Sequence, residues 1–156
     1  MKWQEIAPRV APEFAALTSD EALRSKASGL LEQWMREELF SSQRGPILAH
    51  IEAGRFAQLL DAFYQYVPFG TGGRRGRVGY GPNRINEVTV ALSVQGHCNY
   101  LKDAAKGGPV SVVVAYDTRI FKDLAGQLTF LGEHHPILGL SSKTLARKAC
   151  EIYAAN

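Results

Sequence analysis

Apolar residues recur every three or four positions along most of this chain, which is the spacing of an amphipathic helix. The periodicity predicts helices over residues 19–39, from residue 46, over 56–67, from 86 to about 102, and from about 142 to 155. Ser19 or Asp20 and Asn86 can serve as N-caps, since their side chains accept hydrogen bonds from free backbone N–H groups. Pro46 suits the first turn of a helix. The chain is therefore expected to begin with several packed helices.

One segment has a different pattern. Residues 110–117, "VSVVVAYD", are almost continuously apolar and β-branched, which predicts a strand buried on both faces, as in a parallel sheet. A further helical region is expected from about Arg119, interrupted by residues 132–140. The order of loop, helix, buried strand and helix is typical of an α/β fold with crossover helices.

Length and composition fit one globular domain. The chain has 156 residues, of which 46% are apolar and 21% charged, and its net charge is +3. Such a mild charge does not indicate a nucleic-acid partner, and no segment has the length of a membrane span. Cys98 and Cys150 lie far apart and lack the spacing of metal ligands, so we expect buried, reduced thiols and a cytoplasmic location.

The helical pattern is interrupted by a segment that we call the glycine-arginine loop, residues 68–86, "PFGTGGRRGRVGYGPNRIN". It holds six glycines and four arginines. Glycine-rich turns expose backbone N–H groups to anions, and arginine matches phosphate with a planar pair of donors. The composition favours a phosphate-binding loop, with a solvated surface hairpin as the alternative. The sequence fits neither a P-loop nor a dinucleotide-binding fingerprint.

The order of residues in this loop resembles the opening of the phosphoglucomutase/phosphomannomutase family, the α-D-phosphohexomutases. The match continues into the following helix and includes a second motif, "YDTR", in which Tyr116, Asp117 and Arg119 end the predicted strand. Upstream, "LLEQWM" resembles an N-terminal helix of the same family. The matching loop and helix positions are Phe69, Gly70, Thr71, Gly73, Arg75, Gly76, Gly79, Gly81, Asn83, Arg84, Asn86, Thr89, Gln95 and Gly96.

The resemblance implies a fold and a division of the chain. Residues 1–67 would be a helical preface, and residues 68–156 part of the first mutase domain. That domain is a three-layer α/β/α structure with a mixed, mostly parallel sheet, here expected to be incomplete. Residues 128–142 depart from the family pattern and are expected to be an insertion.

It also implies an activity. Family members interconvert hexose 1-phosphates and 6-phosphates through a phosphoserine and a bisphosphate intermediate, with Mg²⁺. Thr71, Gly72, Gly73 and Arg75 would line the substrate site, and Asp117 would hold Arg119 nearby as a supporting pair. Partners would be hexose phosphate, hexose bisphosphate and the remaining mutase domains. Neither nucleic acid nor membrane is expected.

Some of the family's motifs are absent from this sequence. It has no Ser-His-Asn-Pro loop, which carries the phosphoserine, and no aspartate-rich loop for the metal. We therefore expect an N-terminal fragment that is inactive alone and contains no metal site; the alternative is a stand-alone sugar-phosphate-binding module. His134 and His135 are expected to face solvent. Arg74 and Arg77 are expected to be solvated, while Arg84 and its neighbours stabilise the turn.

Overall fold

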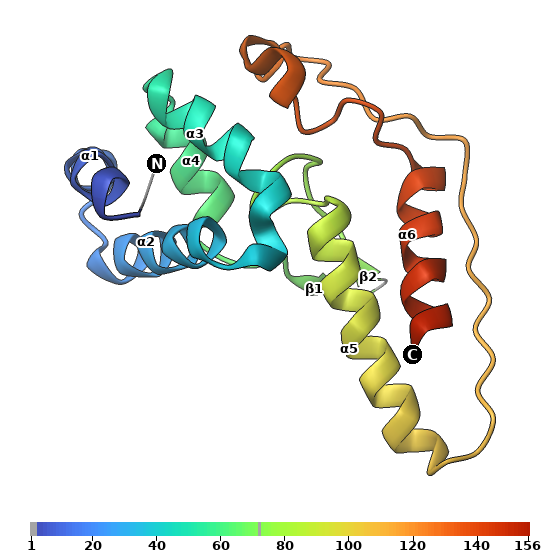
Figure 1. Cartoon of the computed structure of the whole chain (residues 1–156). Helices are drawn as coiled ribbons and strands as arrows, with labels where there is room; N and C mark the ends of the chain where they lie inside the picture. The colour runs from blue at the N-terminus through green and yellow to red at the C-terminus, as the bar shows by residue number, and fades with distance from the viewer. Residues whose placement is uncertain (1–2, 72) are drawn as a thin grey trace.

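The computed structural model describes residues 3–71 and 73–156 (Figure 1). Five helices form the N-terminal part: α1 (Trp3–Leu17), α2 (Glu21–Arg36), η1 (Glu38–Gln43), α3 (Arg44–Glu52) and α4 (Phe56–Phe63). Helix α2 begins at the predicted N-cap, where the Asp20 side chain accepts a hydrogen bond from the Leu23 N–H at 2.9 Å. The sequence pattern did not predict α1, which contains Pro8 and Pro12.

An aromatic cluster occupies the centre of the N-terminal core. The Trp34 ring stacks on Phe40 with centroids 4.5 Å apart and meets the Phe63 ring edge-on at 5.7 Å. Tyr80 from the glycine-arginine loop and Val88 from the next helix belong to the same core. Because this core includes side chains from both sides of residue 67, the loop rests on a rigid helical support. The division into residues 1–67 and 68–156 remains a prediction.

The rest of the chain is built around two long helices. A short hairpin of β1 (Phe69–Gly70) and β2 (Gly73–Arg74) precedes α5 (Glu87–Ala105), and η2 (Thr129–His134) precedes α6 (Ser142–Ala155). Helices α5 and α6 pack against each other around a small second core of Val94, Cys98 and Ala149 (Figure 1). Helix α6 has the predicted bounds, since Ser141 caps it through a hydrogen bond from the Thr144 N–H.

The predicted buried strand at residues 110–117 is wrong for this structure. The segment has no assigned secondary structure and runs as a single extended chain (Figure 1). Val113 is 94% exposed. A parallel strand needs hydrogen-bonded neighbours, and within the described ranges the only assigned strands are β1 and β2, which pair antiparallel. The structure thus contains helices and a small sheet, and the three-layer, mostly parallel sheet is not confirmed.

Three smaller expectations also need correction. Residues near Arg119 form no helix, and the first helical turn after them is η2. Cys98 is buried as expected, but Cys150 is exposed. His135 is largely buried, with its side chain 16% exposed and its Nε2 3.4 Å from Asp123 Oδ2. In the part of the chain that the structure describes, no helix is long and apolar enough to cross a bilayer.

Candidate functional site

The first half of the glycine-arginine loop forms a tight hairpin. Phe69 lies opposite Arg74, and Gly70 lies opposite Gly73. Gly73 has a φ of +107°, a conformation that side-chain-bearing residues rarely adopt. This confirms that the turn requires glycine, as expected for a loop that exposes its backbone. Thr71 is exposed in the turn, and Gly72 lies outside the described residues.

The arginines of the hairpin lie in different surroundings. Arg75 is exposed and makes no hydrogen bond or ion pair with any described residue. The Arg77 side chain is 81% exposed, as predicted, and its Nη1 lies 4.0 Å from Asp61 Oδ2. Arg74 is half-buried, with its guanidinium carbon 4.5 Å from the centre of the Phe69 ring. The expectation that Arg74 is solvated is wrong, because Phe69, directly across the hairpin, covers it.

The second half of the loop is anchored to α4. The Arg84 guanidinium pairs with the Asp61 carboxylate and donates a hydrogen bond to the Asp61 carbonyl oxygen at 3.1 Å. Asn83 Nδ2 donates to the same carbonyl oxygen at 2.8 Å. Gly81 has a φ of +90°, and a Cβ there would lie 2.9 Å from the Ala62 carbonyl oxygen. The loop is therefore fixed in place by Gly81, Asn83 and Arg84. The sequence predicted this role for Asn83 and Arg84.

Asn86 connects the loop to α5. Its Oδ1 accepts a hydrogen bond from the Thr89 N–H at 2.9 Å, and Thr89 Oγ1 accepts one from the Asn86 N–H at 3.0 Å, which forms a capping box. Asn86 Nδ2 also donates to the carbonyl oxygens of Gly79 and Gly81, both at 2.9 Å. A single buried side chain thus starts the helix and fixes the loop before it, which confirms the predicted cap.

Asp117 and Arg119 form the predicted pair. Arg119 Nε donates to Asp117 Oδ2 at 2.7 Å, and the Arg119 backbone N–H donates to Asp117 Oδ1 at 3.0 Å. The backbone hydrogen bond is the largest cause of a lowered pKa for the Asp117 carboxyl. The pair lies near the start of α6, where the Asp117 N–H donates to Ser142 Oγ. Among the described residues, no contact joins this pair to Thr71, Gly73 or Arg75.

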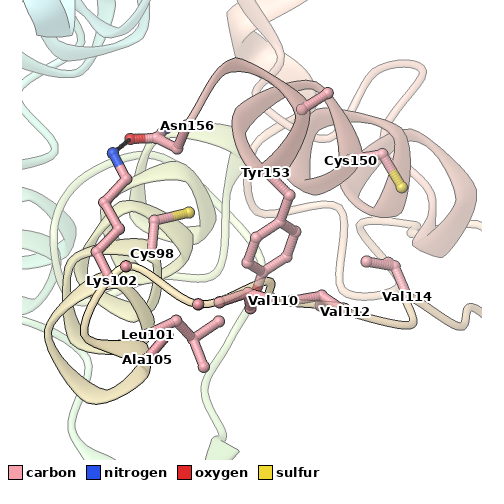
Figure 2. A pocket seen from close by; sticks show the side chains of 13 residues that line it. Cys98, Leu101, Lys102, Ala105, Val110, Val112, Val114, Cys150, Tyr153 and Asn156 are labelled. Carbon is pink, nitrogen blue, oxygen red and sulfur yellow. Dashed lines mark hydrogen bonds between the residues drawn. The ribbon is translucent and has the colours of Figure 1, made fainter.

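Surface cavities flank the α5–α6 pair, and two of them adjoin the segments considered above. The larger, of about 640 Å³, lies between α5, residues 107–114 and α6, with the Val110, Val112 and Val114 side chains along one wall (Figure 2). The second, of about 510 Å³, lies between the hairpin, α5 and α6, and Phe69, Arg74, His97 and Tyr153 contribute to its lining. Sequence reasoning missed this second cavity. The sequence feature that could have indicated this cavity is the position of Phe69 and Arg74 on the two sides of the hairpin turn, where they pair.

The described residues do not form a magnesium site. Mg²⁺ prefers several oxygen ligands, chiefly carboxylates, and no group of three or more His, Cys, Asp or Glu side chains gathers in the ranges described. Asp117 is bound to Arg119, and Asp61 to Arg84. No step of the chemistry is therefore assigned to a metal held by these residues.

Comparisons with known proteins relate part of the chain to a family. Residues 67–132 match the family described as phosphoglucomutase/phosphomannomutase, alpha/beta/alpha domain I. This match confirms, over these residues, the resemblance to the N-terminal domain of that family seen in the sequence.

Individual relatives are consistent with this assignment. The chain is similar to a phosphopentomutase of Homo sapiens, 28% identical over 144 residues that cover 92% of this chain and 21% of that protein. It is 27% identical over 135 residues to a probable phosphoribomutase of Schizosaccharomyces pombe, covering 77% of this chain and 23% of that protein. A 57-residue stretch is 44% identical to a phosphoglucomutase of Staphylococcus haemolyticus, covering 36% of this chain and 10% of that protein.

The chain spans about a fifth of the length of the first curated relatives that it matches. No solved structure matches it.

Proposed function

We propose that this chain supplies one wall of the substrate site of a sugar-phosphate mutase, with the hairpin at Thr71, Gly73 and Arg75 as the part that contacts the phosphate. The observation that carries the proposal is the geometry of the hairpin. A glycine-dependent turn exposes the backbone, and the Arg75 guanidinium next to it has no anionic partner among the described residues. Positioned cations and backbone donors are what phosphoryl transfer requires.

The rest of the reaction is assigned to the longer enzyme. In it, a phosphoserine would exchange a phosphoryl group with hexose 1-phosphate or 6-phosphate through a bisphosphate, with Mg²⁺ held outside the residues described. The names of the relatives make a pentose phosphate an equal candidate for the substrate. Gly72 would line the same turn, and Asp117 with Arg119 would support it. We place the enzyme in the cytoplasm.

The chain alone is expected to bind without turnover. Its sequence contains no Ser-His-Asn-Pro motif, so it lacks the family's phosphoryl carrier. In the alternative, a stand-alone binding module, the same hairpin would hold a sugar phosphate without any further domain. Conversion of glucose 1-phosphate or ribose 1-phosphate by the purified chain would contradict both the assignment as one wall of a mutase site and the alternative of a binding module.

The phosphate contact can be tested by titrating inorganic phosphate into the chain and following backbone amide signals by NMR. One exposed arginine–phosphate contact contributes about 1–3 kcal/mol, so the expected Kd is millimolar or weaker. Arg75→Ala should abolish the shifts at Thr71 and Gly73. Arg77→Ala is the matched control, because that arginine is exposed but lies beside Asp61. Equal losses in both variants would reduce the loop to a nonspecific cationic surface.

A further inference from the structure

Arg74 is a half-buried cation without an anionic partner. Its Nε is inaccessible to solvent and has no hydrogen-bond partner among the described residues, and burial lowers the pKa of its guanidinium. The Phe69 ring lies against it, with the guanidinium carbon 4.5 Å from the ring centre. Buried charges are normally paired, since removing a charge from water is costly. The guanidinium therefore has hydrogen-bonding capacity that the described protein does not use.

Arg74 lines a cavity of about 510 Å³ whose walls are mostly apolar, with Leu92 and Val94 beside a few aromatic and polar side chains. Phe69, whose side chain is largely exposed, lies on the hairpin side, and His97 and Tyr153 lie on the helices. His97 Nδ1 and the Tyr153 hydroxyl share a hydrogen bond of 2.7 Å. His97 Nε2 has no partner within residues 3–71 and 73–156, so it can bond to a ligand. A cation, an imidazole and an aromatic face thus meet at one place.

Gly96 is a second, independent sign of a ligand at this place. It lies in the interior of α5 and lines the same cavity. Glycine lowers helix stability relative to alanine, yet a Cβ at this position would meet nothing within 4 Å. Packing within the described structure therefore does not require the glycine. The open space above it lets another molecule approach the helix backbone closely.

We propose that this cavity binds a small phosphorylated sugar, with the phosphate at Arg74 and His97 and the sugar ring between Phe69 and Gly96. Arg74 ends β2 and lines this cavity, whereas Arg75 lies one residue beyond the strand, is exposed and does not line it. The choice of a sugar as the ligand rests on the proposed function. The position of the phosphate rests only on the unpaired Arg74.

The test uses the full chain and amide NMR, with inorganic phosphate, ribose 5-phosphate and ribose as separate probes. Both phosphates should shift the Gly96 and His97 signals with Kd values of about 1 mM or weaker, and ribose should not. Arg74→Gln should raise the Kd of inorganic phosphate and of ribose 5-phosphate, as measured at these signals, by about tenfold. Arg77→Gln, the same change at an exposed arginine of the same loop that lies beside Asp61, should leave them unaltered. An Arg74→Gln variant that binds like the wild type would overturn the site.

Gly96→Ala separates a ligand role from a structural one. The added methyl group should leave the thermal midpoint unchanged or raise it, because alanine favours helix and nothing crowds it. It should weaken the binding of ribose 5-phosphate by about tenfold and that of inorganic phosphate much less, since the sugar ring and not the phosphate lies against Gly96. A further outcome is a wild type that binds ribose 5-phosphate no more tightly than inorganic phosphate while both depend on Arg74. That result would support an anion site at Arg74 and would contradict the sugar-phosphate ligand, which is taken from the proposed function.

Discussion

His50 is a titratable side chain buried entirely within the N-terminal core. It is 0% exposed, and its Nδ1–H donates to the Pro46 carbonyl oxygen at 3.0 Å, while Nε2 has no partner among the described residues. Burial is the largest cause of a pKa below 6.5, and the positive charges of Arg55 and Arg84 lower it further. The hydrogen bond with Pro46 and the nearby Gln58 side chain raise the pKa and partly offset these effects. The imidazole is therefore held neutral.

This predicts a loss of stability in mild acid. Above about pH 6.5 His50 is neutral in both the folded and unfolded states, so it adds no pH dependence. Below that pH the unfolded chain binds a proton at His50 that the folded state does not bind. The free energy of unfolding therefore falls by up to about 1.4 kcal/mol per pH unit. The fall continues until the pH reaches the folded-state pKa.

Urea unfolding of the wild type and of His50→Leu at pH 7.5 and pH 5.5 measures the effect. The free energy of unfolding should differ less between pH 7.5 and pH 5.5 in His50→Leu than in the wild type. The variant lacks the imidazole that takes up a proton only on unfolding. Identical pH dependence in the two proteins would show that His50 is not held neutral.

At the scale of single residues, the sequence predicted capping better than it predicted burial. The caps at Asp20 and Asn86 could be identified because a cap bonds to a residue only three positions further along the chain. The environment of Arg74 could not, because it depends on which residue the turn places opposite it. Likewise, His135 is covered by a residue twelve positions earlier, Asp123, which no local pattern connects to it.

At the scale of elements, helices were predictable and the strand was not. A helix satisfies its own backbone hydrogen bonds, so periodicity and caps largely define it. Helix α1 was missed because two prolines, Pro8 and Pro12, make its sequence atypical of a helix interior. Residues 110–117 have strand composition, but a strand requires partners, and β-propensity describes fit to a sheet that must already exist.

The extended segment should therefore be dynamic in this chain. We expect the amides of residues 110–116 to exchange with solvent nearly as fast as unstructured peptide, since no ladder hydrogen bonds protect them. Helix α5 residues in the same spectrum serve as the internal reference. Slow exchange across residues 110–116 would indicate strand pairing and contradict the description.

A pair of valine substitutions extends this prediction to stability. Val113→Ala should change the free energy of unfolding by less than about 0.5 kcal/mol, because the side chain is 94% exposed. Val10→Ala, at a position that is 1% exposed, should cost about 2 kcal/mol. Denaturant unfolding compares the two directly. Similar losses in both variants would show that residues 110–117 pack as a strand.

At the scale of the whole molecule, a helical core holds one glycine-dependent hairpin against two long helices. Tyr80, Arg84 and Asn86 fasten the loop to that core, so the hairpin projects from a fixed base. The relation to sugar-phosphate mutases could be identified from the sequence because it depends on a local motif. The different surroundings of Arg74, which is half-buried, and Arg75, which is exposed, could be assigned only from the structure.

The measurement that tests this account most directly is an NMR titration of the chain with glucose 1-phosphate, compared with glucose. The account predicts millimolar binding that shifts the amide signals of Thr71, Gly73 and Arg75, and no shifts with glucose, because the phosphate supplies the contact. Equal shifts with both ligands, or none with glucose 1-phosphate, would contradict the assignment of this hairpin to a sugar-phosphate site.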